Sequence, residues 1–138
     1  MTRFQPASPP IIVDASFAVE ALGGAQPALE LLGANTSGSG MKLVPAHFWL
    51  EIANALLRIR ASEASILADL RLLADAGIEV ADRTLFGASD SIGLARAHQL
   101  TTYDAAYLQL ALDVEGELAT YDRALAQAAT AEGVVVRP

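Results

Sequence analysis

Short apolar runs separated by longer segments of helical character form the main pattern along this chain. The runs have the length and the β-branched content of strands. The alternation of strands with helices predicts right-handed crossovers and a parallel sheet covered on both faces, which is an α/β fold. The predicted strands are residues 11–13 (IIV), 42–44 (KLV), 78–80 (IEV), 117–120 (ELAT) and 134–136 (VVV).

Apolar side chains between these runs recur at helical spacing. The segment "HFWLEIANALLRIRA" and the segment "EASILADLRLLADAG" show this pattern most clearly, and the second ends at a glycine. Two later segments, "DAAYLQLAL" and "DRALAQAATAEG", are rich in Ala and Leu, which favour helices. The apolar faces of the first two helices consist of Phe48, Ile52, Leu56 and Ile59, and of Ile66, Leu70 and Leu73.

The length of 138 residues is typical of one domain, and we expect a single domain spanning residues 1–138. The first ten residues contain three prolines and predict an irregular N-terminal arm over 1–10. The stretch "GANTSGSG" at 33–40 predicts a flexible connection rather than a domain boundary.

Composition narrows the class of protein. No apolar run approaches the roughly 18 to 20 residues of a membrane span, and no signal-peptide pattern is present, so we expect a cytoplasmic protein with no membrane partner. The chain has no cysteine, which excludes disulfides and thiolate metal sites. The net charge of −7 by itself argues against a general nucleic-acid binder, whose affinity comes largely from neutralising phosphates.

Four acids fall at strand ends or helix starts. Asp14 follows the first strand, Glu51 lies in the first turns of the helix after the second strand, Asp104 opens the helix before the fourth strand, and Asp122 follows that strand. In open parallel α/β sheets, ligands bind outside the carboxyl ends of the strands. These acids are therefore candidates for a site, although each one alone has an ordinary explanation as a helix cap or a solvated helix residue.

Two polar residues accompany the acids. Asn54 lies three residues after Glu51, on nearly the same face of the helix, and Ser16 lies two residues after Asp14. Ser16 is also a candidate cap for a helix that begins near Phe17. Asp82 likewise follows a strand, yet we assign it no role, because position alone does not establish a site.

The sequence resembles the PIN-domain ribonucleases, and more narrowly the VapC-type toxins of toxin-antitoxin pairs. The resemblance spans residues 11–136 through "IIVDAS", "VPAHFWLEIANAL", "TTYDAAYLQLAL" and "LATYDRALAQAA" followed by "GVVV". It departs at His98 and Gln99, where a glycine is more typical. The resemblance implies a three-layer α/β/α fold with a five-stranded, mostly parallel sheet of order 3-2-1-4-5. It also implies a metal-binding and catalytic set, Asp14, Glu51, Asp104 and Asp122, supported by Ser16, Asn54 and Thr120.

With that strand order, the four acids are expected to lie in one crevice, and Asp82 leaves from the edge strand. Two carboxylates about 4 Å apart repel by roughly 4 kcal/mol at an effective dielectric constant near 20, so such a cluster needs positive charge. His47 and His98 are poor candidates for ligands, because neither has a second histidine spaced to join it. Oxygen ligands favour Mg²⁺ or Mn²⁺, with one or two ions per site.

The resemblance further implies an activity and partners. The expected activity is metal-dependent endoribonuclease hydrolysis of an RNA phosphodiester by a metal-activated water, and the sequence does not distinguish tRNA, rRNA and mRNA as substrate. The expected partners are a VapB-like antitoxin and a second copy of the chain in a homodimer. Arginines such as Arg58 and Arg123 are candidates for an RNA-facing rim, as is Lys42, but none is assigned to the site.

Three alternatives stay open. A phosphoacceptor receiver domain needs a lysine after a late strand, whereas the only lysine, Lys42, lies at the second. A phosphatase of the haloacid-dehalogenase type needs a second Asp where Ser16 stands. A non-catalytic PIN-like module for RNA binding or protein interaction fits the same residues.

Overall fold

Five short strands pair in parallel in the order β3-β2-β1-β4-β5, in a computed structural model that describes residues 8–33 and 40–138. The central strand is β1, in which Ile12 pairs with Leu43 of β2 on one side and with Leu118 of β4 on the other. The predicted fold class and strand order are confirmed. The strands are β1 (Ile11–Val13), β2 (Lys42–Val44), β3 (Ile78–Val80), β4 (Glu117–Ala119) and β5 (Val136–Arg137).

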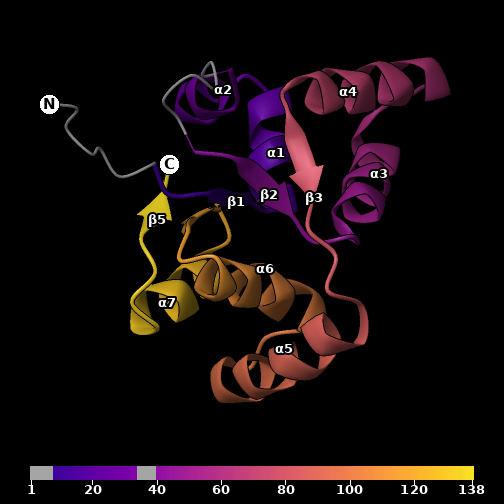
Figure 1. Cartoon of the computed structure of the whole chain (residues 1–138). Helices are drawn as coiled ribbons and strands as arrows, with labels where there is room; N and C mark the ends of the chain where they lie inside the picture. Colours follow the sequence, from indigo (N-terminus) through magenta and orange to yellow (C-terminus); the bar gives the residue numbers. More distant parts are fainter. Residues whose placement is uncertain (1–7, 34–39) are drawn as a thin grey trace, which may run out of the picture.

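Helices cover both faces of the sheet and produce three layers (Figure 1). One layer contains α1 (Ala15–Leu22), α2 (Gln26–Gly33), α3 (Phe48–Ile59) and α4 (Glu63–Asp75). The other contains α5 (Thr84–His98), α6 (Thr102–Asp113) and α7 (Arg123–Ala131), with α5 packed on α6 as an outer helix. None of the helices in the described ranges is long and apolar enough to cross a bilayer.

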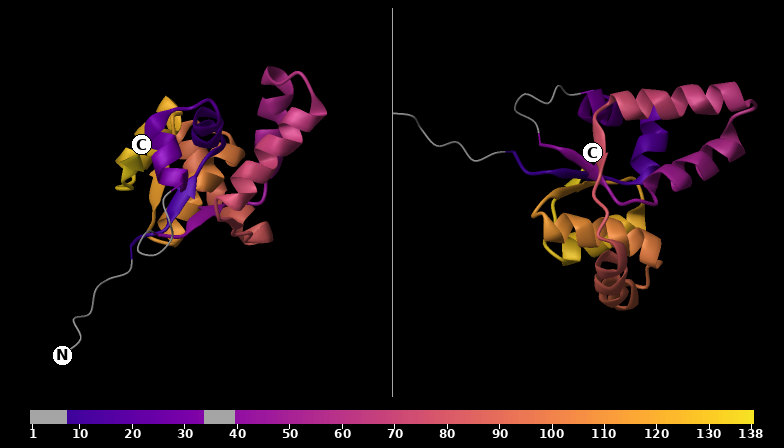
Figure 2. Two further views of the ribbon diagram at one scale, coloured as in Figure 1. Left: turned by 90° about the horizontal axis from the view of Figure 1, so that it is seen from above. Right: turned by 45° about the vertical axis from the view of Figure 1, so that its right-hand side comes forward.

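The apolar face predicted for α3 is confirmed over most of its length. Phe48, Ile52 and Leu56 are fully buried, and so are the strand residues Ile12 and Val13. The prediction was wrong for Ile59, which is 52% exposed. The reason is that α3 and α4 project beyond the sheet as a pair, and Ile59 lies at the far end of α3 (Figure 2).

The ends of the chain differ in part from the predictions. The last strand begins at Val136 rather than at residue 134. Most of the N-terminal arm and of the connection expected at 33–40 falls on residues 1–7 and 34–39, which lie outside the described residues. Gly33, expected in that connection, is the last residue of α2.

Candidate functional site

Asp14 lies at the carboxyl end of the central strand, where β1 passes into α1. Its carboxylate is almost fully buried and caps α1 by accepting a hydrogen bond from the Phe17 backbone N–H at 2.9 Å. The Ser16 hydroxyl donates to the same oxygen at 2.7 Å, and the Thr120 hydroxyl donates to the other oxygen at 2.5 Å. Asp14, rather than Ser16, is therefore the cap of this helix, and Ser16 serves as its partner.

Burial raises the pKa of Asp14 to about 6, because a carboxylate removed from water loses solvation. The hydrogen bonds from Thr120, Phe17 and Ser16 oppose this shift, and the negative charge of Asp122 adds to it. Asp14, at the end of β1, therefore interacts electrostatically with Asp122, which follows β4.

The loop after β4 brings Thr120 and Asp122 to this edge of the sheet. The Thr120 hydroxyl accepts from the Asp122 backbone N–H at 2.9 Å while it donates to Asp14. Asp122 caps α7 by accepting from the Leu125 N–H at 2.9 Å. The Ser16 hydroxyl oxygen accepts from the Tyr121 N–H at 3.0 Å, so the starts of α1 and α7 are joined by hydrogen bonds.

Glu51 reaches the site from the first turn of α3. One of its carboxylate oxygens accepts a hydrogen bond from the Tyr107 hydroxyl at 2.9 Å and lies 3.0 Å from Nε2 of His47, one turn earlier on the chain. Tyr107 is buried on α6, and its pKa is raised by burial and by the neighbouring Glu51 charge. The glutamate is therefore held by a side chain of α6 and by the histidine that precedes α3.

Asp104 lies in the first turn of α6, whose cap is Thr101. Its pKa is raised, first by burial and then by the negative charges of Asp122 and Glu51. Asp104 thus links Asp122, and through it Asp14, to Glu51 on α3. The four acids named from the sequence are therefore linked by the influence of their charges on one another, and we call them the acid cluster: Asp14, Glu51, Asp104 and Asp122.

Not every predicted residue joins the acid cluster. Ser16 and Thr120 do, through their hydrogen bonds with Asp14. Asn54 is exposed one helical turn beyond Glu51, and within the described chain its side chain forms no hydrogen bond with the acids. Asp82, used as a control, is exposed after the edge strand β3 and accepts a hydrogen bond from the Thr84 N–H at 2.8 Å.

Sequence reasoning missed two partners of Glu51, namely Tyr107 and His47. A signal was present for each: Tyr107 follows Asp104 by three residues on one helix face, and His47 precedes Glu51 by four. The other histidine, His98, pairs with Glu132 on α7's carboxyl side instead.

The donor set of the acid cluster fits a hard divalent cation in kind, because carboxylates and hydroxyls are the ligands that Mg²⁺ and Mn²⁺ take. Burial is the main cause of the raised pKa values of Asp14 and Asp104, and the charges of neighbouring acids add to it; a bound cation would offset both effects. As the side chains stand, no three of the Asp, Glu and His residues in ranges 8–33 and 40–138 are close enough to hold one ion together.

Lys42 is the first residue of β2 and therefore lies at the amino end of that strand. Asp14 and Asp122 lie beyond the carboxyl ends of β1 and β4, at the other end of the strands. Its buried Nζ donates to the carbonyl oxygens of Leu32 at 2.7 Å and Ala76 at 3.0 Å, near the ends of α2 and α4. A receiver-type mechanism needs a lysine beside the acids, so this position rules out that alternative.

Comparison with known proteins agrees with this fold. The family model of the PIN domain matches residues 11–131. A search of curated protein sequences finds no match. Among solved structures, a protein of Pyrobaculum aerophilum superposes with a TM-score of 0.70 and 20% identity, covering 94% of this chain and 90% of its own length.

Two further structures are similar. The sarcin-ricin-loop-cleaving toxin VapC20 of Mycobacterium tuberculosis has a TM-score of 0.69 and 20% identity, covering 93% of this chain and 99% of its own. A toxin-antitoxin complex from Klebsiella pneumoniae has a TM-score of 0.59 and 17% identity, covering 81% of this chain and 86% of that chain. At these identities the likeness establishes the fold.

Proposed function

Because this chain belongs to the PIN-domain family, we propose that it is a Mg²⁺-dependent endoribonuclease and the toxin of a type II toxin-antitoxin pair. The observation that carries the proposal is the acid cluster, in which four carboxylates from distant parts of the chain share one edge of the sheet. Repulsion between these carboxylates destabilises the folded protein, and a bound catalytic cation would offset that repulsion.

In this proposal, Asp14, Glu51, Asp104 and Asp122 hold one or two Mg²⁺ or Mn²⁺ ions. When bound, such ions lower the pKa of a water and stabilise the charge that develops on a phosphodiester. The protein's own contribution is orientation. Ser16 and Thr120 fix both oxygens of Asp14, Tyr107 and His47 fix Glu51, and Asn54 extends from the same helix to orient water or substrate.

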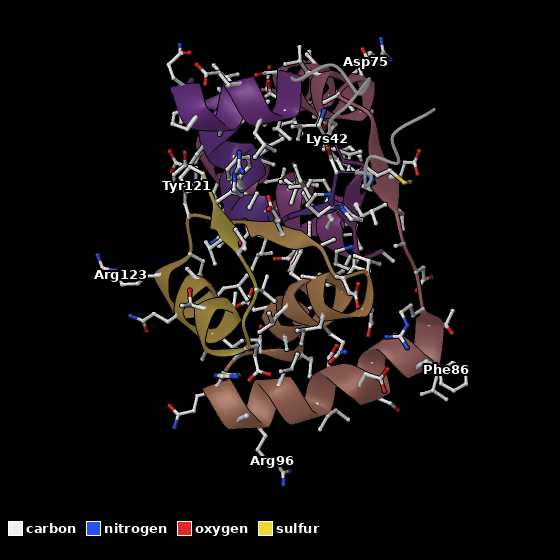
Figure 3. The ribbon with its side chains drawn as sticks, turned by 60° about the vertical axis from the view of Figure 1, so that its left-hand side comes forward. Lys42, Asp75, Phe86, Arg96, Tyr121 and Arg123 are labelled. Carbon is white, nitrogen blue, oxygen red and sulfur yellow. The ribbon has the colours of Figure 1, made fainter. Side chains whose placement is uncertain are left out.

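Bound cations also explain how a protein with a net charge of −7 can bind RNA. Two divalent ions change the formal charge of the chain from −7 to −3 and place the positive charge where the phosphate binds. Fixed cations contribute less: Arg60 pairs with Asp69, and Lys42 is buried. Arg123, beside Asp122, points outward into solvent and is available to a phosphate (Figure 3).

A VapB-like antitoxin and a second copy of the chain are the partners that we propose. The projecting pair of helices α3 and α4 exposes large apolar side chains, with Leu50, Leu57, Leu67 and Leu72 each more than 60% exposed. Leu50 neighbours Glu51, so a protein segment that covers this surface also reaches the acid cluster. We place the protein in the cytoplasm, where RNA substrates and a co-expressed antitoxin are present.

The test is cleavage of RNA in the presence of Mg²⁺, with and without chelator, by the wild type and by Asp14→Asn and Asp104→Asn. We expect cleavage by the wild type alone and only without chelator. Cleavage that persists in the variants or in chelator would show that a metal nuclease is the wrong assignment. Growth arrest on expression, relieved by the same substitutions and by the antitoxin, separates a toxin from a housekeeping nuclease.

A non-catalytic PIN-like module is the second candidate. It is favoured by one observation, that no three acidic or histidine side chains among the described residues are close enough to share an ion. A Mg²⁺ titration by calorimetry separates the two candidates, because the module predicts no heat of binding that depends on Asp14.

A further inference from the structure

The tripeptide Thr-Tyr-Asp occurs twice, at residues 102–104 and 120–122. Each copy places a tyrosine directly before an acid of the acid cluster. Tyr103 is 62% exposed and Tyr121 is 39% exposed. Neither ring belongs to the buried core.

Both rings are held in place from one side. Tyr121 stacks on the buried Phe17, with ring centroids 5.4 Å apart and planes at 15°, and its N–H donates to Ser16. Tyr103 lies against the ring of His47, with centroids 5.3 Å apart, and its carbonyl oxygen is 3.0 Å from Nε2 of that histidine. Phe17 thus supports one face of the Tyr121 ring, whereas the rings of Tyr103 and His47 are tilted at 60° to one another. These contacts restrict both side chains, so less freedom is lost when another ring stacks on them.

The two tyrosines contact the surroundings of different acids. Tyr121 contacts Ser16 and Phe17, which hydrogen-bond to Asp14, whereas Tyr103 contacts His47, which lies against Glu51. Both rings therefore stand beside the acid cluster.

We propose that Tyr103 and Tyr121 are stacking platforms for unpaired bases of the RNA substrate beside the cleaved phosphodiester. The inference rests on the proposed ribonuclease function and assigns to it two residues that contact bases. A duplex keeps its bases stacked on one another, whereas an unpaired base presents a free face that an aromatic ring can cover.

The net negative charge of the protein favours binding of RNA by base stacking on aromatic rings over binding by phosphate contacts alone. A protein of net charge −7 has few cations with which to neutralise phosphates, and several of its arginines are engaged: Arg83 with Asp90 and Asp113, and Arg60 with Asp69. Beyond the metal ions and Arg123, affinity must then come from contacts that do not depend on charge. Stacking on an aromatic ring is such a contact and accepts any base.

The experiment measures binding of two fluorescein-labelled single strands of about twelve ribonucleotides in Mg²⁺, one with all its bases and one with abasic sites at the central positions. The proteins are the full-length wild type, Tyr103→Ala, Tyr121→Ala and the corresponding Phe variants. Phe86→Ala is the matched control, because Phe86 is a 70% exposed aromatic on α5 at the opposite side of the molecule from Tyr121 (Figure 3). A gel shows whether the RNA strand stays intact during the measurement. If the strand stays intact, its Kd is measured; if the protein cuts it, KM and kcat are determined as separate quantities.

We expect each Ala substitution to weaken Kd or raise KM for the base-bearing strand about tenfold, with little change for the abasic strand. The Phe variants retain the ring and should match the wild type, as should Phe86→Ala. Thermal unfolding of each variant checks that the fold is intact.

The proposal is overturned if wild type binds both strands equally or neither, or if the Ala and Phe variants behave alike. It is also overturned if the Ala variants bind RNA normally but lose a partner protein, since the rings would then serve a protein contact. The ribonuclease assignment fails separately, when wild type binds the base-bearing strand but cuts no RNA in Mg²⁺.

Discussion

The Thr120 hydroxyl donates a hydrogen bond to the Asp14 carboxylate across 106 positions of the sequence. The same hydroxyl accepts from the Asp122 N–H, so one oxygen atom connects two acids of the acid cluster. Thr120 is almost fully buried, which makes these bonds stronger and their loss more costly than at the surface.

Thr120→Val should lower the free energy of unfolding by about 1–3 kcal/mol, because it leaves a buried carboxylate oxygen and a backbone N–H without this partner. Urea denaturation measures the change. Thr120→Ser keeps the hydroxyl and should recover most of the loss. Thr130→Val is the control on α7, where the hydroxyl is exposed and donates only to the Ala126 carbonyl, and an equal loss there would contradict the special role of Thr120.

Asp14→Asn should change how stability depends on pH. The pKa of Asp14 is about 6 in the folded protein and near 3.8 in the unfolded chain, so the folded state holds this proton more tightly. Its contribution to stability is therefore full below about pH 4 and is lost as the pH rises to about 6, by about 3 kcal/mol without metal. Urea titrations between pH 4 and 7 without metal should show this fall in the wild type and a smaller one in Asp14→Asn. Parallel curves for the two proteins would refute it.

Tyr107→Phe removes the hydroxyl that donates to Glu51 and leaves the ring in the core. We expect unfolding to become easier by about 1–2 kcal/mol and Mg²⁺ to bind about tenfold more weakly, because Glu51 is then oriented by His47 alone. Calorimetric titration with Mg²⁺ gives the second quantity. Tyr103→Phe is the matched control with an exposed ring, and unaltered Mg²⁺ binding in Tyr107→Phe would exclude the orienting role.

Gln99→Gly should stabilise the protein by about 1 kcal/mol. Gln99 ends α5 in the left-handed conformation, with φ 55° and ψ 42°, where a side chain crowds the following carbonyl. Gly77 has φ +82° after α4, so Gly77→Ala should cost a similar amount in the opposite direction. Thermal or urea unfolding measures both, and a loss of stability in Gln99→Gly would show that the glutamine side chain contributes more than its backbone strain costs.

The strands were predictable because each is short, apolar and β-branched, and four of the five begin at the expected residue. The buried face of α3 followed from helical spacing, except at Ile59, where the helix outruns the sheet. Helix α5 carried no clear apolar stripe, and it buries only Ser91 because it packs outside α6.

The sequence by itself determined the α/β class and the first residue of four strands, and it named the four acids as candidates, because apolar periodicity and the position of an acid at a strand end or helix start can be read locally along the chain. Strand order came from the family resemblance and not from periodicity. Only the tertiary structure decided that Tyr107 holds Glu51, that Asn54 stays outside the hydrogen-bonded set, and that Tyr103 and Tyr121 stand exposed beside the acids. Those facts depend on which helix faces meet across the sheet edge, and contacts between residues 56 to 106 positions apart leave no periodic trace in the sequence.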